Sequence, residues 1–148
     1  MNVLIDSSVW SLALRRSTVP ADPAVQALRE LIDDSRARII GPIRQEILSG
    51  IREPAQYEKL RDTLRAFPDL ELTAADYERA AELFNLCRRQ GVQGSNTDFL
   101  ICAVAERLEL SINWPAQLDQ KCPLQLVTLG RVVRSDNARY AMAIERYE

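Results

Sequence analysis

Short apolar segments alternate with segments of helical periodicity along most of the sequence, and this alternation most constrains the fold. Apolar and β-branched residues predict strands over residues 3–5, 38–40, 70–72, 108–113 and 124–129. Between the strands, apolar residues recur at helical spacing, for example at Val25, Leu28 and Leu31. Strands that alternate with helices favour a mostly parallel sheet covered on both faces. The predicted fold class is therefore α/β.

Capping and turn residues give the boundaries of the predicted helices. Asp22 and Pro23 form a helix start, in which an N-cap residue is followed by proline in the first turn. Gly50 and Gly91 stand where helices are expected to end. Helices are predicted over residues 23–32, 42–49, 54–67, 76–90 and 98–108.

The 148 residues are expected to form one domain that is large enough to bury a core. Residues 129–148 are expected to be a C-terminal extension of this domain, and they are predicted to be helical because Tyr140, Ile144 and Tyr147 recur at helical spacing. The longest apolar stretches are far shorter than a membrane span, and no secretory signal is visible. The expected location is cytoplasmic, without a membrane.

The inventory of side chains excludes several kinds of active site. The sequence has no histidine, and its three cysteines are widely spaced without a CxxC pair. A zinc site and a histidine general base are therefore not expected. The 19 basic and 21 acidic residues give a formal charge of −2, so there is no basic coat for nucleic acid. This balance is still compatible with a nucleic-acid enzyme whose carboxylates hold metal ions.

Four carboxylates stand out by their positions. Asp6 directly follows the first predicted strand, at the end of a parallel strand where α/β folds bind ligands. Glu46 lies in the short helix "IRQEILSG", next to an apolar face where partial burial is expected. Asp98 opens a strongly apolar helix, and Asp119 lies in the loop between the last two predicted strands.

Each of these acids has a structural explanation as well as a functional one. Asp6 could cap a helix that begins at the serines after it, and Asp98 could stabilise a helix N-terminus through its charge. Asn96 and Thr97 could cap that same helix. Carboxylates that meet in one cleft, however, repel one another unless a cation neutralises them. Mg²⁺ or Mn²⁺ prefers such ligands and supports phosphodiester cleavage without histidine.

Three segments resemble the PIN-domain family in order, spacing and overall chain size, and above all the VapC-type toxins of bacterial toxin–antitoxin pairs. The first, "VLIDSSVW", has a strand that ends in Asp6, followed by small hydroxyl residues and an aromatic residue. The second, "IRQEILSG", has Glu46 on a short helix with Gly50 four residues later. The third, "DFLICAVA", has Asp98 before a run of alanine and aliphatic residues. The resemblance covers roughly residues 1–128.

This resemblance implies a Rossmann-like three-layer α/β/α sandwich and a metal-dependent endoribonuclease that uses Mg²⁺ or Mn²⁺. Asp6 and Asp98 would hold the metal, directly or through water. Glu46 would hold a metal-bound water or a second metal and help to orient the attacking water. The implied partners are an RNA substrate, a cognate VapB-like antitoxin and a second copy of the chain in a homodimer.

The sequence departs from the family after the fourth strand. The family commonly has a Thr-x-Asp-x-Asp-Phe-like run there, whereas this sequence has "INWPAQLDQKC". Asp119 is the only carboxylate between Glu109 and Asp136, so it is the candidate for the fourth acidic position. Asn113 could supply a neutral oxygen instead. The alternative interpretation is a PIN-like module with weak or absent catalysis that binds RNA or a protein.

Two other families with acidic Mg²⁺ sites match less well. A phosphatase of the haloacid-dehalogenase type needs a second acid two residues after the strand aspartate, and that position is Ser8. A receiver domain needs adjacent acids near its start and a late lysine, but the only lysines are Lys59 and Lys121.

Overall fold

The structure of the protein is a computed structural model. It describes residues 2–15, 23–89, 91, 93–113, 131–134 and 140–143. None of the helices in these ranges is long and apolar enough to cross a membrane.

A six-stranded sheet forms the centre of the fold, with the strand order β3-β2-β1-β4-β5-β6. The strands are β1 (Val3–Ile5), β2 (Ala37–Ile40), β3 (Asp69–Leu70), β4 (Ser111–Asn113), β5 (Arg131–Arg134) and β6 (Tyr140–Ala143). All neighbouring pairs are parallel except β5 and β6, which are antiparallel. β1 lies in the middle, where Leu4 is paired with Arg38 of β2 and with Ile112 of β4.

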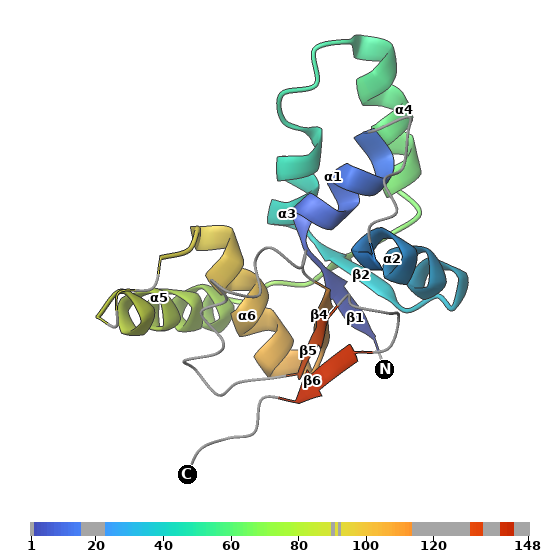
Figure 1. Ribbon diagram of the computed structural model, residues 1–148. Coiled ribbons are helices and arrows are strands. Elements are labelled where there is room, and N and C mark those ends of the chain that lie inside the picture. The colour runs from blue at the N-terminus through green and yellow to red at the C-terminus, as the bar shows by residue number, and fades with distance from the viewer. Residues whose placement is uncertain are drawn as a thin grey trace.

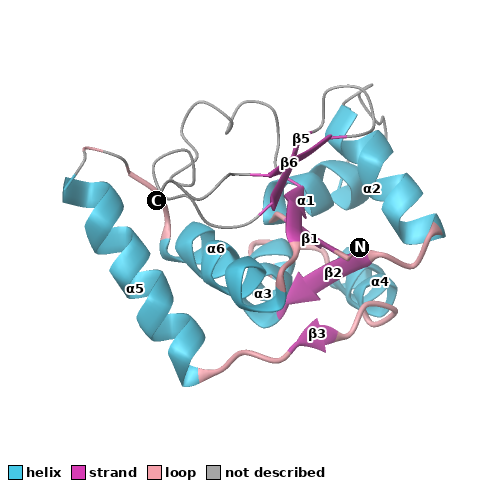
Figure 2. Cartoon of the chain, turned by 90° about the horizontal axis from the view of Figure 1, so that it is seen from below, coloured by secondary structure: helices cyan, strands magenta, loops and turns pink. Residues whose placement is uncertain are grey.

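Helices cover the sheet on both sides, which confirms the predicted α/β fold. They are α1 (Ser7–Arg15), α2 (Pro23–Asp33), α3 (Gly41–Leu48), α4 (Pro54–Leu64), α5 (Ala74–Arg89) and α6 (Asn96–Leu108). Figures 1 and 2 show α5 and α6 together on one side of the sheet and α2 on the other. This arrangement gives the three layers of an α/β/α sandwich.

The predicted start and stop signals act where they were expected. Pro23 and Pro54 each occupy the first position of a helix, where the missing N–H has no intrahelical role. Gly50 and Gly91, which follow α3 and α5, have φ values of 79° and 76°. Residues with a Cβ rarely adopt this left-handed conformation, so these two glycines allow the chain to leave the helices.

The core lies between the sheet and its helices. Every residue of β1 is buried, as a central strand with both faces covered requires. The helix α6 is buried from Phe99 to Ala105, so most of its circumference is packed. A helix that is apolar almost all round must lie inside the protein. The consequence for function is that α6, which carries Asp98, is held rigidly by the core.

The C-terminal tail differs from the prediction. Residues 131–134 and 140–143 belong to the tail predicted to be helical, but they form β5 and β6, and Val132 is paired with Met142. The helical prediction is wrong there because an exposed strand edge offers backbone hydrogen bonds that local apolar spacing does not reveal. The strand predicted over residues 124–129 lies outside the described residues.

Candidate active site

The topology brings three chain segments to the edge where the central parallel strands end. Asp6 follows β1, α3 begins directly after β2, and β4 ends at Asn113. The chain turns from α6 into β4 through Glu109, which has a φ of 53°. Because α6 runs back against the direction of β4, its first turn lies at the edge where β4 ends. Asp98 therefore lies at the same edge as Asp6, which is where α/β sheets place their ligands.

Asp6 is a buried carboxylate that caps the helix that follows it. Its residue is 3% exposed. Its Oδ2 accepts hydrogen bonds from the backbone N–H of Ser8 (3.0 Å) and from the Ser8 hydroxyl. Its own N–H donates to the carbonyl oxygen of Asn113 (3.1 Å), which ties the end of β1 to the end of β4. The structural role predicted for Asp6 is thus present.

Burial raises the pKa of the Asp6 carboxyl above its ordinary value, and the negative charge of Asp98 adds to the rise. The hydrogen bonds from Ser8 and Ser7 oppose this effect without cancelling it. The two carboxylates therefore act on each other electrostatically, although they lie far apart in the sequence. Two like charges at one partly buried site favour a bound cation.

Asp98 also helps to cap its helix, but as the third residue of α6 and not as the N-cap. Its Oδ2 accepts a hydrogen bond from the N–H of Ser95 (2.8 Å), and its N–H donates to the Ser95 Oγ (3.1 Å). This is a capping box, with Ser95 as the N-cap. The cap was expected at Asn96 or Thr97 but is formed by Ser95. The Ser-x-x-Asp spacing of residues 95–98 was the signal in the sequence that could have identified it.

Hydrogen bonds hold the carboxylates of Asp6 and Asp98 in place. In both, Oδ2 accepts hydrogen bonds at the start of a helix, and Ser7 also bonds to the Asp6 carboxylate. These bonds fix the position of each side chain, and a carboxylate has further lone pairs that can bind a ligand. Two hard oxygen donors on rigid helix starts fit Mg²⁺ or Mn²⁺, which usually takes one or two carboxylates and completes its shell with water and phosphate.

Glu46 is exposed, which corrects the expectation of partial burial. Its neighbours Ile43 and Ile47 occupy the buried face of α3, so the glutamate points away from the core. Arg44 holds this helix in place, because its Nε donates to Asp69 Oδ1 (2.9 Å) and its Nη1 to the carbonyl of Leu64 (3.0 Å). An exposed carboxylate on a fixed helix remains accessible to water and substrate.

The predicted four-carboxylate cluster is described only in part. Asp119 lies outside the described residues. Within the described part of the chain, no three histidine, cysteine, aspartate or glutamate side chains come close enough together to hold a metal ion. Asn113 is fully buried at the end of β4, beside the backbone of Asp6. Of the predicted site residues, Asp6 and Asp98 are thus described at the edge where the parallel strands end, and Glu46 is described on α3.

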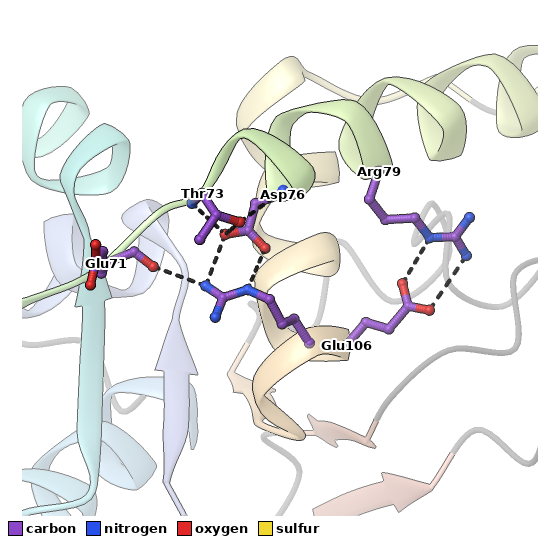
Figure 3. A network of polar contacts seen from close by, with 6 residues as sticks. Glu71, Thr73, Asp76, Arg79 and Glu106 are labelled. Atoms are coloured by element: carbon purple, nitrogen blue, oxygen red, sulfur yellow. Dashed lines mark hydrogen bonds and ion pairs between the residues drawn. The ribbon is translucent and has the colours of Figure 1, made fainter.

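A polar network fixes α6 against α5 (Figure 3). Arg107 donates from Nε to Asp76 Oδ1 (2.7 Å) and from Nη2 to Asp76 Oδ2 (2.8 Å). Arg79 donates from Nε to Glu106 Oε2 (2.9 Å). Arg107 lowers the pKa of Asp76, which is buried and also caps α5 through Thr73. The pairs hold the end of α6 remote from Asp98, so they orient the helix without entering the site.

Sequence comparisons identify relatives over most of the chain. The family model described as PIN domain matches residues 3–112. VapC ribonuclease Mb1587 of Mycobacterium bovis is 33% identical over 109 residues, covering 71% of this chain and 79% of the relative. Ribonuclease VapC11 of Mycobacterium tuberculosis matches with the same identity and coverage.

Comparison with solved structures gives the same fold. The crystal structure of VapBC2 from Rickettsia felis, bound to a DNA fragment from their promoter, aligns with a TM-score of 0.62 and 14% identity, covering 92% of this chain and 100% of that one. The crystal structure of FitAcB from Neisseria gonorrhoeae aligns with a TM-score of 0.58 and 15% identity, covering 74% and 84%. At these identities the likeness concerns the arrangement of helices and strands.

Proposed function

The chain belongs to the PIN domain family, and from this premise we propose that it is a metal-dependent endoribonuclease of the VapC type, acting in the cytoplasm. The curated relatives that it matches over two thirds of its length are named ribonucleases. The observation that carries the proposal is the position of two carboxylates at one edge of the sheet, with Asp6 buried directly after β1 and Asp98 in the first turn of α6.

In this proposal the carboxylates of Asp6 and Asp98 would hold Mg²⁺ or Mn²⁺, directly or through water. Such an ion polarises a phosphoryl oxygen, activates water and stabilises the leaving oxygen. Glu46 orients the attacking water, a role that its exposure on the fixed helix α3 supports. Asp119 is the proposed residue for the fourth acidic position. Ser8 and Ser95 act as positioning residues, because they donate hydrogen bonds to the carboxylates of Asp6 and Asp98.

The proposed partners follow from the same family relationship. A VapB-like antitoxin is the expected inhibitor, and the likeness to the VapBC2 assembly is compatible with such a partner. A homodimer is the expected form of the protein itself. Both proposals are testable by co-expression with a neighbouring antitoxin gene and by light scattering of the purified protein.

Cleavage of a mixed pool of structured RNAs tests the proposal. The wild type, Asp98→Asn and the control Asp62→Asn are each incubated with Mn²⁺ and with chelator. Asp62 is a suitable control because it is an exposed aspartate on α4. We expect wild type and Asp62→Asn to cut only with metal, and Asp98→Asn to lose at least about 100-fold in rate, the size of effect that one electrostatic group has in a site.

Three other outcomes would contradict the proposal in different ways. Equal cutting by wild type and Asp98→Asn would place the active centre elsewhere. Cleavage by the wild type in the presence of chelator would show that the reaction needs no metal ion. Metal binding by the wild type without any cutting would favour the module that binds RNA or protein without catalysis.

A further inference from the structure

Two adjoining pockets form a groove between α5 and the start of α6. The larger, of about 500 Å³, is lined by Tyr77, Phe84 and Asn85 of α5 and by Asn96 and Thr97 of α6, among others. The smaller, of about 290 Å³, shares Phe84 and is lined also by Arg88, Gln93, Gly94 and Phe99. We call this surface the α5 groove. Its larger pocket has the volume of an ordinary small-ligand site.

The α5 groove passes directly beside the candidate active site. Asn96 and Thr97, which line it, immediately precede Asp98. Gly94 forms part of its wall, and a Cβ placed on Gly94 would lie 3.5 Å from Asp98 Oδ2. Pro42 of α3 lines the larger pocket as well. Residues four apart share a helix face, so Pro42 and Glu46 point to the same side of α3.

The side chains along α5 form one continuous stripe. Tyr77, Ala81, Phe84 and Arg88 are spaced by three or four residues, so they lie on one face of the helix. At 1.5 Å per residue this stripe is ~16 Å long. That length is comparable to about five nucleotides of a strand with a 3.4 Å repeat.

The chemistry of the stripe suits single-stranded RNA better than an apolar partner. Tyr77 is 54% exposed, and it is one of three large hydrophobic side chains that are exposed among the described residues. Phe84 is held edge-on by Phe99, with ring centroids 5.3 Å apart, so its position is fixed. Aromatic rings stack with bases of any sequence, while side-chain amides bond to base edges and arginine to phosphate. Asn85 and Arg88 supply these last two groups.

We propose that the α5 groove binds the bases of single-stranded RNA next to the scissile phosphate, with Tyr77 as a stacking residue, Asn85 as a base-reading residue and Arg88 as a phosphate contact. The identity of the strand as substrate rests on the proposed function, but the binding itself does not. Binding in the groove would select which phosphodiester bond reaches Asp98.

Binding is measured first without catalysis. Fluorescein-labelled hexanucleotides A₆, C₆ and U₆ are titrated in chelator with wild type, Tyr77→Ala, Tyr77→Phe and the control Tyr57→Ala. Tyr57 is the matched control because it is an exposed tyrosine on α4, outside the groove. We expect Tyr77→Ala to weaken binding at least about fivefold, since stacking on one base is lost. Tyr77→Phe keeps the ring and should bind as the wild type does, as should Tyr57→Ala.

Two further variants test the proposed roles of Arg88 and Asn85. Arg88→Gln should reduce the slope of log K against log salt by about 0.7, the value for one phosphate contact on a single strand. Arg65→Gln, which alters an exposed arginine on another helix end, should leave the slope unchanged. Asn85→Ala should narrow the difference in affinity among A₆, C₆ and U₆. Thermal unfolding of each variant checks that the fold is intact.

The cleavage sites on a long RNA are then mapped with Mn²⁺. Tyr77→Ala and Asn85→Ala should redistribute the cuts, while Tyr57→Ala keeps the wild-type pattern. If the wild type binds hexanucleotides through Tyr77 but cuts nothing, the groove stands and the nuclease proposal fails. If Tyr77→Ala binds and cuts as the wild type does, the groove proposal is overturned while the nuclease stands. A change of Tyr77→Ala from dimer to monomer with unchanged RNA binding would show that a second copy covers the groove.

Discussion

Asp6 and Asp98 show how one residue serves both the fold and the site. Asp6 is the N-cap of α1, and its Oδ2 accepts hydrogen bonds from Ser8. Asp98 is the third residue of α6, and its Oδ2 accepts a hydrogen bond from the N-cap residue Ser95. A cap of this kind contributes about 1 kcal/mol of stability. Because a carboxylate has lone pairs beyond those that a cap uses, the structural and the functional interpretations of these residues do not compete. Both are satisfied by the same side-chain position.

Asp6→Asn should therefore separate stability from metal binding. Burial and the charge of Asp98 raise the pKa of Asp6, so its ionised form lowers the stability of the fold at neutral pH when no metal is present. The asparagine oxygen still accepts the Ser8 bonds. We expect a Tm in chelator that is equal to the wild-type value or about 2–4 °C higher. Added Mn²⁺ should raise the Tm of the wild type but not of the variant, as measured by differential scanning fluorimetry. An equal rise in both would exclude Asp6 as a ligand.

At the scale of elements, the pairing of α5 with α6 sets the position of the site. The capping box of Ser95 fixes the start of α6, and the ion pair between Arg107 and Asp76 fixes its end. The Arg107 side chain is 35% exposed, whereas the Asp76 side chain is only 2% exposed. Removing the arginine would leave a buried carboxylate without its strongest partner, which costs more than the loss of a surface ion pair.

Arg107→Gln should lower the free energy of unfolding by about 1–2 kcal/mol at pH 7. Arg107 lowers the pKa of Asp76 in the folded state, so the stabilisation is complete above the unfolded pKa and is lost as pH falls through the lower folded value. The difference between variant and wild type should thus shrink below about pH 4. Urea unfolding at pH 7 and pH 3 measures this difference in the free energy of unfolding.

Arg65→Gln is the control. Its pair with Asp62 is exposed, so the variant should change the free energy of unfolding by less than about 0.5 kcal/mol at both pH values. An Arg107→Gln effect independent of pH would contradict this assignment.

At the scale of the whole molecule, the tail completes the sheet. β6 is paired with β5 in antiparallel register. Without β6, β5 would be the last strand of the sheet and its outer backbone edge would have no partner strand. Unpaired strand edges promote association between chains. The tail therefore has a place in the fold that its helical spacing did not suggest.

Deleting residues 135–148 should expose the edge of β5. We expect a lower Tm and self-association at micromolar concentration, because the strand loses its ladder of hydrogen bonds. Size-exclusion chromatography with light scattering and thermal unfolding measure both effects. A truncated protein with the Tm and the mass of the full chain would show that β6 contributes little to the fold.

The sequence by itself determined the features that depend on neighbouring residues. The apolar segments, the helix starts at Pro23 and Pro54 and the turns at Gly50 and Gly91 are local signals, and the structure has its elements at those places. The sequence also indicated the positions of the acidic residues, with Asp6 after a strand and Asp98 in the first turn of a helix. These signals suffice for the fold class because the alternation of strands and helices leaves few arrangements of the chain.

Only the tertiary structure decided what lies beside what. Asp6 and Asp98 interact because β1 and β4 are neighbours in the sheet, and no local spacing specifies that pairing. Glu46 is exposed because the buried face of α3 is filled by Ile43 and Ile47. Residues 140–143 form a strand because β5 offers them an unpaired edge. Burial and strand pairing depend on partners that are distant in the chain. The sequence alone therefore identified the candidate residues, and the tertiary structure determined which of them lie close together.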